Sequence, residues 1–78
     1  MAAVYKGLSH RKRIEILNYI IEHKENGVRL TDLFKNIKMP LQTIDFHLSV
    51  LKKAKLVTYK NKKRNVVYFP EMSVLSFN

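Results

Sequence analysis

The apolar residues of this chain repeat with a helical period through most of its length and with a strand period near its end. Ile14, Leu17 and Ile21 are separated by three and four positions, which places them on one face of a helix. β-branched and aromatic residues fill two later runs, residues 56–60 and 65–69. Because the chain has 78 residues, it has room for one small domain. The sequence therefore predicts an α+β domain in which helices precede a β-hairpin.

Positive charge is the second strong feature of the sequence. The chain has 15 Lys and Arg against 6 Asp and Glu, which gives a net charge of +9. Four cations, Lys60, Lys62, Lys63 and Arg64, stand in five consecutive positions without an acid among them. A polyanion is therefore the expected partner. No apolar run approaches the ~20 residues that span a bilayer, so we expect no membrane partner and a cytoplasmic protein, in the host cytoplasm if the source is viral.

No group of residues has the pattern of a catalytic or metal site. Cysteine is absent, which removes disulfides, cysteine nucleophiles and Cys-type zinc sites. His10, His23 and His47 lie at unrelated spacings, and no pair has the i, i+4 spacing of zinc ligands on a helix. Gly7 and Gly27 are too few for a phosphate-binding glycine loop. We therefore expect no catalytic residues, no metal and no cofactor, and we do not expect an enzyme.

Capping residues and prolines place the boundaries of the predicted helices. Ser9 can cap a first helix of about 16 residues, and Gly27 fits the position just beyond its end. Thr31 can cap a second helix, and Pro40 ends that helix but fits the first turn of a third. The elements predicted after the first helix are a connecting strand at residues 28–30, a short helix at 32–38 and a helix at about 41–54.

The first predicted helix has apolar residues on two faces. If the stripe of Ile14, Leu17 and Ile21 faces the core, Ile16 and Ile20 lie roughly 120 to 160° around the helix. One small core cannot cover both faces, so the second stripe predicts contact with another subunit or with the apolar terminal segments. The predicted homodimer interface consists of Ile16, Ile20, Val74, Leu75 and Phe77.

The third predicted helix has one clear inward stripe, formed by Ile44, Leu48 and Leu51, and Leu41 joins that side. The residues predicted for its outer face are Gln42, Phe46, Ser49 and Lys53, with Thr43 and Val50 on the flank of that face. An ordinary solvated face would carry mainly Lys and Glu, so this face is predicted to make contacts. Phe46 has an alternative position, packed against the first two helices.

The order helix, short strand, helix, turn, helix, hairpin is that of a winged helix-turn-helix domain. Residues 8–17 (LSHRKRIEIL) resemble the opening of the bacterial and archaeal ArsR-like repressors, and residues 41–57 (LQTIDFHLSVLKKAKLV) resemble their recognition helix and its exit into the wing. The resemblance implies one winged-helix domain over residues 1–78. Its predicted parts are a core at 8–70, a recognition helix at about 41–54 and a wing at 56–69.

The resemblance also implies positions for DNA contact, because the family places its third helix in the major groove and its wing tip on the backbone or in the minor groove. By position, the residues expected to face base edges are Gln42, Thr43, Phe46 and Ser49, with Lys53 nearer the phosphates. Gln can bond adenine through two hydrogen bonds, and Phe can pack on a thymine methyl group. The wing cations Lys60, Lys62, Lys63 and Arg64 need only phosphate oxygens.

Two departures from the family pattern affect what is carried over. Lys55 stands where the family commonly has Gly after the recognition helix, so either a left-handed Lys is tolerated or the helix ends differently. A long C-terminal dimerisation helix with metal ligands is not expected, so metal sensing is not carried over. The predicted function is a sequence-specific regulator of transcription that binds double-stranded DNA as a dimeric repressor. The alternatives are a protein–protein interaction module of the same fold and a nonspecific nucleic-acid-binding protein.

Overall fold

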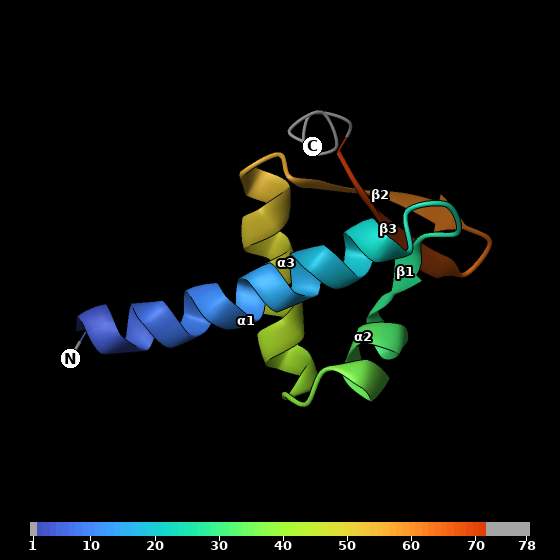
Figure 1. Cartoon of the computed structure of the whole chain (residues 1–78). Coiled ribbons are helices and arrows are strands. Elements are labelled where there is room, and N and C mark those ends of the chain that lie inside the picture. The colour runs from blue at the N-terminus through green and yellow to red at the C-terminus, as the bar shows by residue number, and fades with distance from the viewer. Residues whose placement is uncertain (1, 72–78) are drawn as a thin grey trace.

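Three helices and a three-stranded sheet follow one another in the computed structural model, which describes the backbone of residues 2–71 and the side chains of residues 11–71 (Figure 1). The elements are α1 (Ala2–Glu22), β1 (Val28–Arg29), α2 (Leu30–Asn36), α3 (Leu41–Lys53), β2 (Val57–Lys62) and β3 (Asn65–Pro70). α1 lies across α3, and the sheet stands at the end of α1 that leads into β1 (Figure 1). This order confirms the predicted α+β winged-helix fold.

The sheet is antiparallel with the strand order β1-β3-β2. Tyr68 of the central strand pairs with Val28 on one side and with Tyr59 on the other. The hairpin strands reach Lys62 and Asn65, so the turn is shorter than the run of four residues expected from the sequence. Lys63 at this turn has a left-handed backbone, with φ of 56°, as a central position of a tight hairpin turn commonly requires.

α1 is longer than predicted, because it begins at Ala2 rather than after an N-cap at Ser9. No proline interrupts residues 2–10, so nothing in the chain prevents the helix from continuing through Ser9. At the other end α1 stops at Glu22, and the Gly27 N–H donates to the His23 carbonyl at 2.9 Å. Gly27 has φ of +81°, which confirms its predicted place beyond the helix end.

The predicted core stripe of α1 is wrong. Ile16 and Ile20 are 0% exposed within the single chain, whereas Ile14 is 57% exposed and Leu17 and Ile21 are half-buried. The face with Ile16 and Ile20 belongs to the core cluster that α3, α2 and the sheet complete. Two residues enclosed in this way cannot reach a partner, so the predicted interface role of Ile16 and Ile20 is wrong as well. The other three predicted interface residues, Val74, Leu75 and Phe77, lie outside the described residues.

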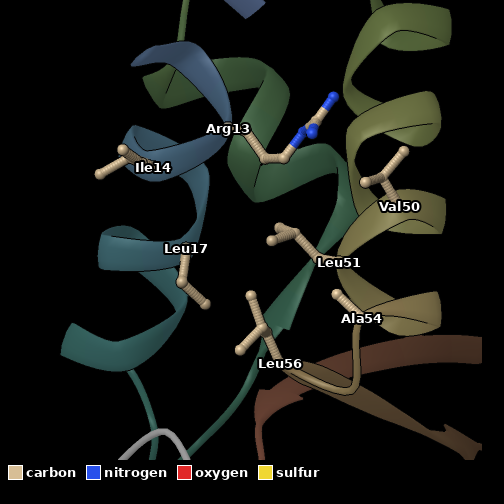
Figure 2. Close-up of a pocket in the computed structure, with 7 residues that line it drawn as sticks. All are labelled: Arg13, Ile14, Leu17, Val50, Leu51, Ala54 and Leu56. Atoms are coloured by element: carbon tan, nitrogen blue, oxygen red, sulfur yellow. The ribbon is translucent and has the colours of Figure 1, made fainter. Parts of the chain in front are cut away.

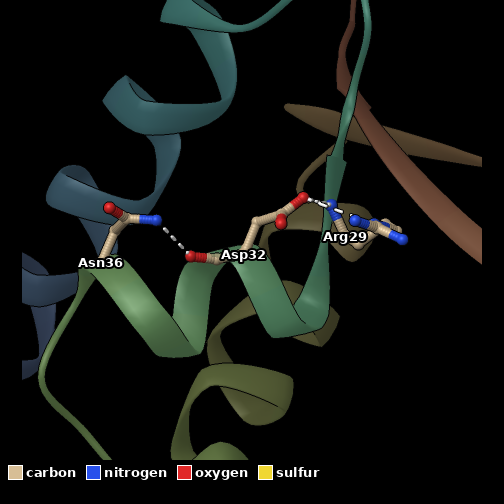
Figure 3. Close-up of polar contacts among 3 residues, drawn as sticks. All are labelled: Arg29, Asp32 and Asn36. Carbon is tan, nitrogen blue, oxygen red and sulfur yellow. Dashed lines mark hydrogen bonds and ion pairs between the residues drawn. The ribbon is translucent and has the colours of Figure 1, made fainter.

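α2 begins one residue before the predicted cap at Thr31, and its start is held by Asp32. The Asp32 carboxylate accepts a hydrogen bond from the Arg29 backbone N–H at 3.1 Å and lies 3.6 Å from the Arg29 Nε (Figure 3). The Asn36 side-chain amide donates to the Asp32 carbonyl at 2.8 Å near the other end of the helix. A carboxylate in the first turn also suits the helix dipole, so this short helix is fixed at both ends.

α3 confirms the predicted third helix, with Pro40 as its N-cap residue and Ala54 as its C-cap residue. Leu41 differs from the prediction, since it is 42% exposed at the start of the helix, where fewer elements pack against it. Lys55 has φ of 61°, so the helix ends with a left-handed Lys in place of the Gly common in the family.

Candidate nucleic-acid interface

The two sides of α3 differ sharply in burial. Ile44 and Leu48 are 0% exposed and Leu51 is 2% exposed, which fixes the inward side of the helix. The opposite side carries the exposed residues Gln42, Thr43, Phe46 and Lys53 and the half-buried Ser49. The structure therefore brings all five predicted residues of this helix to one surface.

Phe46 is the large apolar residue of this outer face, and it is 60% exposed. The alternative in which it packs against the first two helices is therefore wrong. Its ring centroid lies 5.8 Å from that of His47, so one side of the ring is supported by the helix itself. An exposed aromatic ring among polar residues offers a flat apolar contact to a partner.

His47 holds α3 to α1 through a polar contact. It is 3% exposed, and the Arg13 Nε donates a hydrogen bond to its Nδ1 at 3.3 Å. Because Nδ1 accepts this bond, the neutral ring carries its proton on Nε2. Burial, and after it the nearby positive charge of Arg13, lower the pKa of His47 below its ordinary value of 6.5. The fold therefore favours the neutral form of His47.

The four wing cations occupy two different places on the hairpin. Lys63 and Arg64 form the turn, and both are exposed. Lys60 and Lys62 stand on β2, and each places its Nζ 5.5 Å from the centroid of the Phe69 ring. Because side chains alternate along a strand, Lys60 and Lys62 lie on the sheet face opposite Tyr59. The structure thus separates a basic turn from a basic outer sheet face.

Comparison with known sequences gives one informative match. No family model matches the chain. Over 65 residues the chain is 37% identical to an uncharacterized HTH-type transcriptional regulator of Methanocaldococcus jannaschii. The match covers 83% of this chain but only 16% of that protein, so the chain corresponds to a small part of its relative.

Solved structures show the same architecture. An ArsR-like transcriptional regulator from Rhodococcus sp. RHA1 superposes with a TM-score of 0.75 at 25% identity, over 97% of this chain and 69% of that chain. The chain is a winged helix-turn-helix domain resembling ArsR-like regulators. The apo-Zalpha domain of zebrafish PKZ shares the fold, with a TM-score of 0.71 at 20% identity over 81% of this chain and 95% of that one.

In this winged helix-turn-helix domain, α3 stands at the position of the fold's recognition helix and the β2–β3 hairpin at the position of its wing. Within residues 11–71 the ion pairs are Lys12–Glu15 and Arg29–Asp32, both on the surface. None of the cations on the recognition helix or wing therefore has an acidic partner in the described part of the chain. Their charge is available to an external anion.

Lys52 is a residue of the winged helix-turn-helix domain that the sequence did not single out. From the recognition helix its Nζ lies 4.8 Å from the ring centroid of Tyr59 and 6.0 Å from that of Tyr68, so it links the helix to the wing. Burial, followed by the charge of Asp45 and by Tyr59, raises the pKa of Tyr68. A sequence gives no signal for this contact, because it depends on where the hairpin packs.

A cluster of metal ligands and a membrane-spanning helix are both absent from the described residues of the winged helix-turn-helix domain. No three of their His, Asp or Glu side chains lie together as metal ligands would. Within the same residues, no helix combines the length and the apolar character needed to cross a membrane.

Proposed function

We propose that this domain binds double-stranded DNA sequence-specifically and regulates transcription as a dimeric repressor. The observation that carries the proposal is the outer face of α3, where Gln42, Thr43 and Phe46 are exposed beside cations that have no acidic partner in the described chain. The two relatives named as transcriptional regulators, which share its sequence or its fold, support the same role.

The recognition helix supplies the groups that base readout needs. Gln42 at its first turn can make two hydrogen bonds to adenine, and Thr43 can donate or accept. The exposed ring of Phe46 suits a thymine methyl group, which would remove apolar surface of both partners from water. Ser49 and Lys53 follow along the same face, with Lys53 nearer the phosphates.

The wing supplies charge rather than sequence readout. Lys63 and Arg64 at the exposed turn can reach phosphate oxygens without contacting bases. Lys60 and Lys62 on the outer sheet face add positive potential along the hairpin. Since a phosphate contact is independent of base identity, these four residues are proposed to set overall affinity and its salt dependence.

A second copy is proposed because of α1. The N-terminal part of this helix extends beyond the other elements (Figure 1). An isolated helix of two or three turns is marginal in water, so packing against a partner would stabilise it. A domain of this size also has a thin stability margin by itself. Two recognition helices related by a two-fold axis would read half-sites about one DNA turn apart, and occupancy of a promoter would repress transcription.

The test is selection of binding sites from a random duplex DNA pool at near-physiological salt, with the mass of the protein in solution measured alongside. We expect an enriched inverted repeat and a dimer mass. Gln42→Ala should reduce discrimination at one or two base pairs by ~1–3 kcal/mol while nonspecific affinity stays nearly unchanged. Salt-sensitive binding without an enriched sequence would indicate a nonspecific nucleic-acid-binding protein, and absence of binding would favour the protein-interaction module.

A paired set of charge variants assigns the role of the wing. Lys63→Gln with Arg64→Gln should weaken binding to every sequence and flatten the logarithmic salt dependence by roughly 0.9 per lost phosphate contact. The matched control is Lys12→Gln with Lys24→Gln, which removes the same charge from exposed positions outside the proposed interface. An equal change of slope in both pairs would mean that net charge, and not the wing turn, is responsible.

A further inference from the structure

Two cavities beside α3 differ in their lining. The cavity between α1 and α3 has a volume of about 220 Å³ and is lined mainly by apolar side chains, and in Figure 2 the Arg13 guanidinium points away from them. The other cavity, of about 360 Å³, lies where the loop after α3 leads into β2. Its lining consists of Lys52, Lys55, Val57, Thr58, Tyr59 and Glu71. Since all of these except Val57 carry a charged or hydroxyl group, this second cavity, the helix-wing cleft, suits a polar ligand.

Lys52 is held in the helix-wing cleft by aromatic rings of the wing. Its Nζ lies 4.8 Å from the ring centroid of Tyr59 and 6.0 Å from that of Tyr68, and these two tyrosines are paired across β2 and β3. Lys52 is half-buried, whereas Tyr59 is 49% exposed. The ammonium group is thus placed before any partner arrives, so binding costs less side-chain entropy than it would for a free surface lysine.

The charges of the helix-wing cleft select an anion. Within residues 11–71 neither of its lysines forms an ion pair, and Glu71 forms none either. Two cations against one carboxylate leave the cleft positive, and the net charge of +9 of the chain adds to this potential. The hydroxyl groups of Thr58 and Tyr59 are further hydrogen-bond donors. A phosphate group, which has a negative charge and several acceptor oxygens, matches these donors.

We propose that the helix-wing cleft binds a phosphodiester group of the DNA strand that α3 contacts, with Lys52 and Lys55 as its ligands and Tyr59 as the residue that positions Lys52. This inference rests on the proposed DNA-binding function and adds a phosphate contact to it. Lys52 and Lys53 are consecutive residues of α3, so their side chains point about 100° apart. The cleft therefore adjoins the outer face of α3, and β2 leads from it to the wing turn.

A phosphodiester of bound DNA fits this place better than a free phosphate ion. Lys53 stands just before the cleft along the chain, and Lys63 and Arg64 follow it at the wing turn. All three are proposed phosphate contacts. A strand held at both places keeps an intervening phosphate near the cleft, which raises its effective concentration there. A free ion has no such tether and depends on the cleft alone.

Two carboxylates restrict where the phosphate can lie. Glu71 is part of the cleft, so it opposes an anion there. Asp45 lies near Tyr68, because its charge contributes to the raised pKa of that tyrosine, and it precedes Lys52 by seven positions, or roughly 10 Å along the helix. Repulsion by Asp45 disfavours the part of the wing-facing flank near the start of α3. The phosphate is therefore restricted to the lysines at the other end.

The experiment is a double-mutant cycle between the protein and single phosphates of the duplex that site selection supplies. Each phosphodiester of a half-site is replaced in turn by a neutral methylphosphonate, and affinity is measured for the unmodified chain and for Lys52→Gln with Lys55→Gln. We expect the unmodified chain to lose about tenfold or more at one particular linkage. The double variant should be weakened to a similar extent, insensitive at that linkage and still sensitive at the others. Additive losses at every linkage would overturn the proposal.

A control pair separates the cleft from net charge. Lys12→Gln with Lys24→Gln removes the same charge from exposed positions on and after α1, so this pair should stay sensitive to the methylphosphonate at the linkage assigned to the cleft. Glu71→Gln should strengthen binding about threefold, and more than Glu25→Gln, which removes an acid from an exposed turn. Loss of sensitivity in the control pair, or equal gains from the two glutamate variants, would point to general charge attraction and overturn the proposal.

Two tyrosine variants test the positioning of Lys52. Tyr59→Leu removes the ring that holds the ammonium group and should reduce the sensitivity to the methylphosphonate at the assigned linkage. Tyr59→Phe keeps the ring and should keep most of that sensitivity. A merely structural effect of Tyr59→Leu would weaken binding without changing which linkage matters. Full sensitivity at the assigned linkage in Tyr59→Leu would overturn the positioning role.

The result also distinguishes this proposal from the proposed function. Sequence-specific binding without any linkage coupled to Lys52 and Lys55 would overturn the cleft assignment and leave the DNA-binding function intact. Absence of binding to any duplex would overturn both. Saturable binding of inorganic phosphate to the full chain at micromolar concentration, followed by NMR without DNA, would assign the cleft to a free anion and overturn the proposal.

Discussion

α1 and α3 are helices of the same domain, yet only α3 has a single apolar face. On α3 the buried residues Ile44, Leu48 and Leu51 lie on one side, and polar residues dominate the other. On α1 the buried Ile16 and Ile20 compete with a second stripe that includes the exposed Ile14. Periodicity therefore identifies a helix in both cases, but it assigns the core side only where one stripe exists.

Other elements of the fold determine which of the two apolar stripes of α1 faces the core. Ile16 and Ile20 join a cluster with Val28, Leu33 and Tyr68, which come from the sheet and from α2. The other stripe faces the cavity between α1 and α3, where Ile14 and Leu17 are only partly covered. Each stripe thus has a different role, one in folding and the other in a surface cavity.

The largest expected effect tests this contrast directly. Ile16→Ala should lower the free energy of unfolding by about 4 kcal/mol, because it removes a fully enclosed side chain and leaves a cavity. Ile14→Ala makes the same chemical change at a 57% exposed position and should lower it by less than about 1 kcal/mol. Urea unfolding followed by circular dichroism measures both.

Equal losses in the two variants would break the contrast, since they would show that Ile14 is covered in solution, for example by a second copy. If Ile16→Ala does not fold, Ile16→Val and Ile14→Val provide a milder pair, with an expected loss of about 1 kcal/mol for Ile16→Val. In both pairs, the substitution at Ile16 should lower the free energy of unfolding more than the substitution at Ile14.

Local signals explain what the sequence predicted correctly. Pro40 marks the boundary between the second and third helices, and the β-branched runs around residues 56–60 and 65–69 mark the hairpin. The outer face of α3 was predictable because its inward stripe has no competitor. These features depend on neighbours in the sequence, so one sequence is enough to find them.

Contacts between distant residues explain what was missed. The core side of α1 depends on α2 and on the sheet, and the Arg13–His47 hydrogen bond joins residues 34 positions apart. Lys52 reaches Tyr59 only because the hairpin folds back beside α3. The start of α1 at Ala2 was missed for another reason, since a good capping residue such as Ser9 can also stand inside a helix.

α1 and α3 can also be compared at their C-terminal ends. A substitution beyond the end of α1 has the larger expected effect on the free energy of unfolding. Gly27 has φ of +81°, and a Cβ there would meet the Val67 Cγ1 and lie 2.6 Å from the Phe69 Cζ. Gly27→Ala should therefore lower the free energy of unfolding by about 2–3 kcal/mol, from backbone strain and overpacking together. A change below about 1 kcal/mol in urea unfolding would mean that the loop moves away from β3.

The contact between α1 and α3 should make stability depend on pH. The pKa of His47 is lowered in the folded state. Its neutral form therefore contributes to the free energy of unfolding, and this contribution is fully present above the pKa of about 6.5 that His47 has in the unfolded chain. As the pH falls below that value, the unfolded chain takes up the proton first, and this contribution is lost toward the lower folded pKa. The free energy of unfolding should therefore decrease as the pH is lowered from 8 to 5.

Two histidine variants assign this pH dependence. His47→Gln should flatten the decrease, because glutamine cannot take up a proton at these pH values. His23→Gln makes the same substitution at an exposed histidine stacked on Tyr19 and is the matched control. Identical slopes for His47→Gln and the unmodified chain would exclude His47 as the cause.

The smallest expected effect is at the end of α3, and it has the opposite sign to that at Gly27. Lys55 has φ of 61° and is exposed, so its left-handed backbone is strained while its side chain has space. Lys55→Gly should raise the free energy of unfolding by about 0.5–1 kcal/mol, since the relieved strain exceeds the entropy lost by glycine. Lys55→Ala removes the charge but keeps the strain, so it should give no such gain. An equal gain in stability from Lys55→Ala would mean that removal of the charge is responsible. A gain from Lys55→Gly alone would show that Gly27 and Lys55 share a left-handed backbone and differ in the space available to a side chain.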